Sequence, residues 1–75
     1  MNKIRRQAID KIQATIEEAN NELQGLLEEE QEYLDNMPES LQESERANSA
    51  QEAIDAIEDA TSNIQDAIDN LGGIS

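Results

Sequence analysis

The sequence predicts an all-α protein, an antiparallel two-helix hairpin of the coiled-coil type that dimerises into a four-helix bundle. Two long stretches have apolar residues at alternating steps of three and four, which is the spacing of one helix face. The only proline lies between these stretches, where it ends one helix before the next begins. We therefore expect a single domain over residues 1–75, with helices at about 2–36 and 45–71 and a turn at about 37–44.

The first helix is predicted from an apolar stripe that no proline interrupts before Pro38. The stripe comprises Ile9, Ile12, Ile16, Ala19, Leu23, Leu26 and Tyr33. Leu27 and Leu34 widen it on one side. Gly25 lies off the stripe, either as a tolerated surface glycine or as a point of close contact with a partner. Glu30 falls on the predicted seam, where we expect it to pair with Arg46 because an isolated charge is costly to bury.

The turn is placed at the Asn-Met-Pro-Glu-Ser segment, residues 36–40, because proline disfavours helix at the residue before it. Two start signals of the capping-box form follow, at Ser40 and Ser49, with Ser44 between them, and we place the start of the second helix near Ser44. At the other end, Gly72 and Gly73 predict a left-handed stop.

The second helix contains a heptad repeat with small residues beside its seam. The predicted a and d positions are Ala47, Ala50, Ile54, Ile57, Thr61, Ile64, Ile68 and Leu71. The apolar surface of both helices is wider than a two-helix seam needs, which predicts a second interface. We expect a homodimer interface containing Leu27, Leu34, Ala53, Ala60 and Ala67. The alternative is that this face binds a different protein.

Composition excludes several classes of function. The formal charge is −13, which argues against direct contact with nucleic acid or an anionic membrane, because both need basic residues to neutralise phosphate. The chain has no cysteine or histidine, so it lacks thiol and imidazole chemistry and the usual zinc ligands. No apolar run spans a bilayer. We therefore expect no enzymatic activity, no catalytic residues, no cofactor and no metal site, and a cytoplasmic location.

Acidic residues form the most informative pattern. In the second helix they recur every seven residues at the outward f position and fill intermediate b positions, without the lysines that usually accompany them. Helix neighbours three and four apart lie about 5 to 6 Å from one another, close to the spacing of successive phosphates. The predicted partner-binding residues are Glu52, Asp55, Asp59, Asp66 and Asp69, with Glu28, Glu29, Glu32 and Asp35 near the turn.

Basic residues are confined almost entirely to the start of the chain. Lys3, Arg5, Arg6 and Lys11 lie there together with a single acid, Asp10. One interpretation is intramolecular, with these cations near Asp66, Asp69 and the negative end of the second helix. The other is that the first helix overhangs the second and presents a basic tip to an acidic partner or to nucleic acid.

The run Glu28-Glu29-Glu30-Gln31-Glu32-Tyr33-Leu34-Asp35-Asn36-Met37-Pro38-Glu39-Ser40-Leu41-Gln42, followed by Ser44-Glu45-Arg46 and the Ala-Ile-Asp heptads, covers much of the chain. It resembles an uncharacterised family of short acidic helical-hairpin proteins found in bacteria, phages and prophages. The resemblance covers nearly the whole chain, and its specific part is the turn sequence Tyr-x-Asp-Asn-Met-Pro-Glu at residues 33–39. It brings no activity and no site residues. It implies a context in which small acidic phage proteins often inhibit host or defence proteins, some of them as nucleic-acid mimics.

These observations lead us to expect a small acidic protein that binds and blocks a basic surface of another protein, such as a host or defence factor that binds nucleic acid. Acidic side chains would then act as a nucleic-acid mimic. The alternative is a structural or assembly protein that acts through its apolar helical stripe, with acidity serving solubility only. The two hypotheses differ in whether binding depends on salt.

Overall fold

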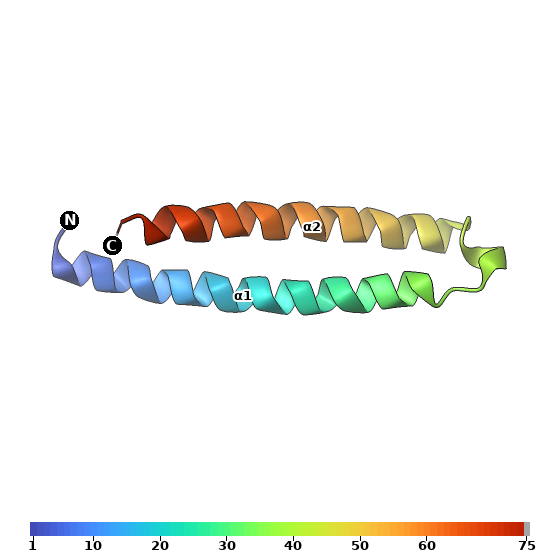
Figure 1. Cartoon of the computed structure of the whole chain (residues 1–75), viewed down its shortest axis with the longest axis horizontal. Coiled ribbons are helices and arrows are strands. Elements are labelled where there is room, and N and C mark those ends of the chain that lie inside the picture. Colours follow the sequence, from blue (N-terminus) through green and yellow to red (C-terminus); the bar gives the residue numbers. More distant parts are fainter. Residues whose placement is uncertain (75) are drawn as a thin grey trace.

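The chain folds into an antiparallel hairpin of two long helices (Figure 1). The computed structural model describes residues 1–74. Helix α1 spans Lys3–Asp35, a short 3-10 helix η1 spans Glu39–Leu41, and α2 spans Glu45–Gly72. The helices predicted from the sequence, at 2–36 and 45–71, lie within one residue of these bounds. Both termini lie at one end of the hairpin and η1 lies at the other (Figure 1).

Side-chain caps start both helices. The Asn2 side chain accepts a hydrogen bond of 2.8 Å from the backbone amide of Arg5, and the Ser44 hydroxyl accepts one of 3.4 Å from the amide of Ala47. Ser44 also donates to the carbonyl of Leu41, which ties the 3-10 helix to the start of α2. Each cap satisfies an amide that the helix itself leaves unpaired.

The end of α2 differs from the predicted left-handed stop. Its C-cap, Gly73, is right-handed, with φ −70° and ψ −13°, and no described glycine has a positive φ. The Gly73 amide instead donates to the carbonyls of Asp69 and Leu71. The expectation failed because glycine permits the left-handed region without requiring it.

The seam of α2 follows the predicted heptads, since all eight a and d residues are buried or half-buried. The seam of α1 differs from the predicted stripe. Its residues that are not fully exposed recur at alternating steps of three and four: Ile9, Gln13, Ile16, Asn20, Leu23, Leu27, Glu30 and Leu34. Leu27 and Leu34 therefore lie on the side that faces α2, whereas Ile12, Leu26 and Tyr33 are 54%, 53% and 49% exposed.

Three polar residues occupy seam positions of α1. Gln13 donates a 3.3 Å hydrogen bond to the backbone carbonyl of Ile68, and Asn20 is only 3% exposed. Glu30 is half-buried and lines the same surface depression as Arg46, but no ion pair joins these two described residues. The predicted Glu30–Arg46 pair is therefore not formed. Glu30 was expected on the seam, whereas Gln13 and Asn20 were not, because a periodicity search for apolar residues passes over glutamine and asparagine.

The hairpin is long and exposes much of its surface. Its Cα extents are 59 by 14 by 13 Å and its radius of gyration is 17.2 Å, against about 11 Å for a compact domain of this length. The buried apolar residues are Met37, Ala47, Ala50, Ile54 and Ile68. Within the part of the chain that the structure describes, no helix is long and apolar enough to cross a membrane.

Candidate interaction surfaces

The heptad positions of the two helices define how the hairpin's surfaces are arranged. In α1, Gln13 and Asn20 occupy a positions and Ile16 and Leu23 occupy d positions, which sets the remaining letters. The Gln13–Ile68 hydrogen bond joins an a residue of α1 to an a residue of α2. In this register, the g positions of the two helices flank one side of the seam and the e positions flank the other.

The acidic ridge lies on the outer side of α2. We use this name for the five predicted residues on α2, all of which are exposed: Glu52, Asp55, Asp59, Asp66 and Asp69. They occupy the b and f positions, which point away from α1 because a and d face it. The ridge is interrupted between Asp59 and Asp66, where Ser62 occupies the b position, and this gap corresponds to a rise of about 10 Å along the helix.

Neutral side chains hold two of the ridge carboxylates in place. Gln51 Nε2 donates a 2.9 Å hydrogen bond to Asp55 Oδ1, and Gln65 Nε2 donates one of 3.1 Å to Asp69 Oδ1. Both pairs are four residues apart, where helix side chains are neighbours. A lysine at these sites would neutralise its partner, whereas the glutamine amide orders the carboxylate and leaves its negative charge in place.

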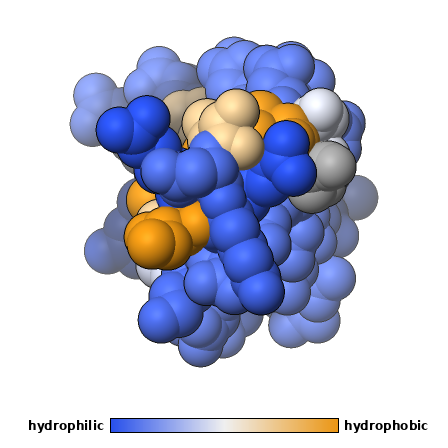
Figure 2. All heavy atoms as spheres, turned by 90° about the vertical axis from the view of Figure 1, so that its left-hand side faces the viewer, coloured by the Kyte–Doolittle hydropathy of each residue, from blue (hydrophilic) through white to orange (hydrophobic). Residues whose placement is uncertain are grey.

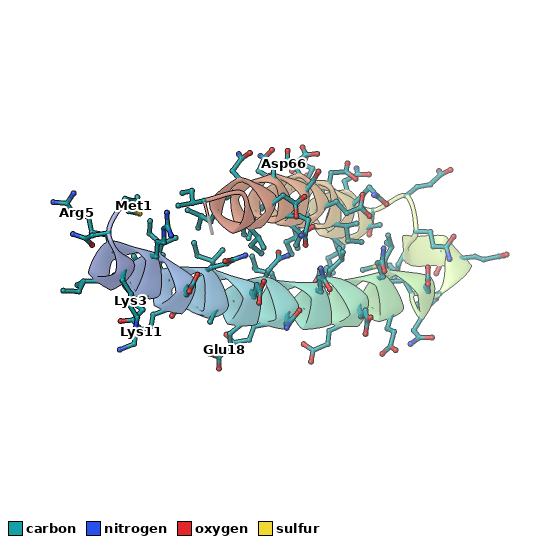
Figure 3. All side chains as sticks on the ribbon, turned by 60° about the vertical axis from the view of Figure 1, so that its left-hand side comes forward. Met1, Lys3, Arg5, Lys11, Glu18 and Asp66 are labelled. Atoms are coloured by element: carbon teal, nitrogen blue, oxygen red, sulfur yellow. The ribbon has the colours of Figure 1, made fainter. Side chains whose placement is uncertain are left out.

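The four predicted acids near the turn do not join this ridge. Glu28, Glu29, Glu32 and Asp35 are exposed at b, c and f positions of α1. The outer sides of the two helices face in opposite directions, as Figure 3 shows for Glu18 on α1 and Asp66 on α2, which both occupy f positions. The nine predicted partner-binding residues therefore form two separate surfaces, and one flat partner cannot contact both at once.

The basic tip, which comprises Lys3, Arg5, Arg6 and Lys11, lies at the end of the hairpin where both termini are found. Among the described residues, no ion pair joins these cations to Asp66 or Asp69. A direct ion pair with these two acids is therefore absent, while the interaction of the cations with the negative end of the α2 dipole does not require one. Because Gln13 is level with Ile68, the first turns of α1 extend beyond the last turn of α2, as Figure 1 also shows. Hydrophobic side chains are exposed among hydrophilic ones at this end (Figure 2).

A continuous apolar face lies on the g side of the hairpin. From α1 it contains three large exposed side chains and one alanine, and from α2 three half-buried alanines: Ile12, Ala19, Leu26, Tyr33, Ala53, Ala60 and Ala67. Tyr33 and Arg46, the g residues nearest the turn, together line two surface hollows. This shared lining supports the g-to-g register.

The opposite, e side of the hairpin is polar. Glu17 and Gln24 of α1 and Gln65 of α2 line one depression together with the buried Asn20. The remaining e residues are Lys3, Asp10, Gln31, Gln51, Glu58 and Gly72. The hairpin as a whole is therefore amphipathic, with one apolar side and one polar side.

Part of the apolar face was not predicted from the sequence. Ala53, Ala60 and Ala67 were assigned to a second interface, but Ile12, Leu26 and Tyr33 were assigned to the intramolecular seam in place of Leu27 and Leu34. A signal was available, because Ile12, Ala19, Leu26 and Tyr33 recur at steps of seven, as the three alanines of α2 do. Two parallel seven-residue rows beside a seam indicate a second contact surface.

No three acidic side chains among residues 1–74 are grouped so that they could hold a metal ion. Comparison of the chain with protein-family models, with curated proteins and with solved structures found no match.

Proposed function

We propose that this chain is a small acidic protein without enzymatic activity that binds and blocks a basic surface of another protein. The class of partner we propose is a host or defence factor that binds nucleic acid, in line with the phage context that the resemblance implies. The observation that supports this proposal is the acidic ridge, in which neutral amides order two of the five carboxylates and no ion pair with a described cation neutralises any of them.

The charge of α2 favours association with a basic surface. The helix carries seven acidic residues and a single basic one, Arg46, which lies in its first turn. An exposed helix surface in an ordinary coiled coil mixes both signs and gains stabilising pairs four residues apart. An unmixed surface forgoes that stabilisation, and a complementary basic partner is attracted to it over a Debye length of about 8 Å.

The ridge geometry divides the proposed contact into two segments. Glu52, Asp55 and Asp59 succeed one another at steps of three and four, as Asp66 and Asp69 do, so neighbours within each segment lie about 5 to 6 Å apart. We propose that these segments occupy two adjacent phosphate-binding subsites of the partner.

The test is to neutralise the ridge without changing its shape. Full-length protein captures candidate partners from a host lysate, and the affinity of a captured partner is then measured by calorimetry at low and high salt. Substitution of Glu52→Gln, Asp59→Asn and Asp66→Asn is expected to weaken binding at least ten-fold at low salt, and the wild-type protein is expected to displace DNA from the partner.

The matched control removes three charges elsewhere. Glu17→Gln, Glu18→Gln and Glu22→Gln lie on exposed positions of α1 and change the net charge by the same amount. Equal weakening by both triple variants would mean that only net charge matters and that the ridge has no specific role. An affinity that neither triple variant nor salt alters would refute the charge-mediated function.

A second candidate function is assembly through the apolar face, and the exposure of Ile12, Leu26 and Tyr33 favours it. We propose that two hairpins associate through this face into a four-helix bundle. The acidic ridges lie on the outer sides of α2 and stay accessible in such a dimer. Sedimentation of the wild-type protein as a monomer at tens of micromolar would refute the dimer and leave the ridge proposal standing.

A further inference from the structure

We infer that a second copy of this chain covers the apolar face in a head-to-tail orientation, so that the basic tip of each hairpin lies against the turn end of the other. This inference rests on the proposed dimer and specifies its interface and its direction. Three observations carry it: the amount of exposed surface, the separation of charge along the hairpin, and the symmetry of the apolar row on α1.

The exposed surface matches what a dimer of this size would bury. The chain exposes 5678 Å², whereas a compact monomer of 8.3 kDa exposes about 4,600 Å². The excess of about 1,100 Å² is comparable with the roughly 800 Å² per partner of a standard protein interface. One long side of the hairpin, 59 by 14 Å, has a similar area of about 800 Å². The apolar face runs along about 32 Å of α1 from Ile12 to Tyr33, in the middle of that side, so an interface of standard size also includes the basic tip and the turn end.

Two orientations bring two apolar faces together with twofold symmetry. If the axis runs along the hairpin, like ends coincide and α1 of one copy stacks on α2 of the other. If the axis runs across the hairpin, opposite ends coincide and each helix stacks on its own counterpart. The two arrangements bury the same face, so the apolar residues alone do not select between them.

The distribution of charge selects the second orientation. Residues 1–11 carry a net charge of +3, whereas residues 28–45 contain eight acids and no base. The two segments lie at opposite ends of a hairpin 59 Å long, far beyond a Debye length of about 8 Å. Coincident like ends would bring two acidic turns together. The head-to-tail dimer instead places each basic tip against an acidic turn. The cations of the tip form no ion pair with α2 of the same chain, so they are available for this contact.

The apolar row of α1 fits the same orientation. Its g positions are Arg5, Ile12, Ala19, Leu26 and Tyr33, a row that is symmetric in size about its small central residue. In the head-to-tail dimer, Ala19 meets Ala19 of the second copy and Ile12 meets Leu26. Arg5 then lies against Tyr33 of the second copy, where a guanidinium stacks favourably on an aromatic ring.

The turn end also offers space for the tip. A hollow of about 370 Å³ is lined there by Tyr33, Met37, Pro38 and Leu41, with Asn36 and Arg46 at its polar part. In the head-to-tail dimer, the overhanging first turns of α1 lie across this hollow. Because the first turns of α1 extend beyond α2 of the same chain, they have no helix packed against them there. In the dimer, the turn end of the second copy packs against them.

Cysteine cross-linking tests the orientation directly, because the chain contains no cysteine of its own. Single variants Ala19→Cys, Ile12→Cys and Leu26→Cys are oxidised under mild conditions at tens of micromolar. Ala19→Cys is expected to form a covalent dimer alone. Ile12→Cys and Leu26→Cys are expected to cross-link when mixed and not when oxidised separately. Glu18→Cys, on the outer side of α1, is the matched control and is expected to form no covalent dimer.

The orientation in which like ends coincide predicts a different cross-linking result. Coincident like ends would place Ala19 over Ala60, so that Ala19→Cys would cross-link only when mixed with Ala60→Cys. That result would overturn the head-to-tail arrangement and leave the proposed dimer intact. A wild-type protein that sediments as a monomer would overturn both, and neither result bears on the acidic ridge.

A charge exchange provides a second test that uses exposed residues only. Arg5→Glu with Arg6→Glu is expected to raise the dimer dissociation constant about ten-fold or more, and addition of Glu29→Lys with Glu32→Lys is expected to restore it. These pairs lie about 40 Å apart within one chain, so rescue cannot be intramolecular.

The matched control combines Arg5→Glu and Arg6→Glu with Glu17→Lys and Glu18→Lys. It has the same net charge of −13 as the exchanged variant, but its new lysines lie near the middle of the hairpin. Sedimentation equilibrium measures the dissociation constant and circular dichroism verifies that helix content is unchanged. Rescue by the turn-end lysines alone supports the head-to-tail dimer, whereas equal rescue by both pairs, or by neither, overturns it.

Discussion

Gln13 Nε2 donates a 3.3 Å hydrogen bond to the backbone carbonyl of Ile68, and so joins residues 55 positions apart in the chain. This bond links the two helices near the open end of the hairpin, where η1 and the turn impose no constraint. It also sets which residues of α1 and α2 are level with one another, and thereby which side chains share the apolar face.

Replacement of Gln13 by alanine is expected to destabilise the hairpin by about 1 kcal/mol, because it removes this hydrogen bond and part of the seam packing. Urea unfolding followed by circular dichroism measures the change. Gln7→Ala is the control, since Gln7 is exposed on the overhanging part of α1, and its unfolding midpoint should match the wild type. A Gln13→Ala midpoint equal to that of Gln7→Ala would show that the bond contributes nothing.

Asn20 is expected to lower the free energy of unfolding while it restricts the register of the helices and the oligomeric state. It lies in the seam at 3% exposure, and its Oδ1 accepts no hydrogen bond from any described residue. Asn20→Leu should therefore raise the free energy of unfolding by about 1 to 3 kcal/mol. A buried asparagine at an a position also restricts register and oligomeric state. Sedimentation should accordingly detect a broader range of assemblies for Asn20→Leu, and a variant less stable than wild type would contradict this account.

Leu26 and Leu27 are adjacent in sequence but should respond differently to truncation. Leu27 is half-buried in the seam, so Leu27→Ala is expected to cost about 2 kcal/mol of hairpin stability. Leu26 is 53% exposed on the apolar face, so Leu26→Ala should mainly raise the dissociation constant of the proposed dimer. Thermal unfolding over a range of protein concentrations separates the two effects. If Leu26→Ala instead lowered hairpin stability and Leu27→Ala did not, Leu26 would belong to the seam, as the sequence alone predicted.

Gly25 is expected to be a tolerated surface glycine. It lies in the middle of α1 with a helical backbone, and a Cβ built on it meets nothing within 4 Å. Gly25→Ala should therefore stabilise the protein by about 1 kcal/mol through helix propensity and reduced freedom of the unfolded chain. A variant of unchanged stability that loses affinity for a captured partner would instead identify Gly25 as a point of close contact.

The sequence by itself determined the local features of this protein. Heptad spacing in residues 47–71 predicted the seam of α2 residue by residue, because seven of its eight positions carry isoleucine, leucine or alanine at regular steps and the intervening residues are polar or alanine. Pro38 and Ser44 located the break between the helices, since proline cannot continue a helix and serine caps one. These signals depend on backbone chemistry and on neighbours within one or two helical turns.

Only the tertiary structure decided which side of α1 faces α2. Ile12, Leu26 and Tyr33 form one regular row and Leu27 and Leu34 belong to another, and both rows satisfy helical periodicity. The choice between them depends on how the two helices pair along their whole length. In that pairing, α2 buries small residues such as Ala47 and Ala50, and the carbonyl of Ile68 accepts a hydrogen bond from Gln13. That pairing is a property of two distant segments, so no local pattern contains it, and it leaves the apolar face and the basic tip free for contacts outside the chain.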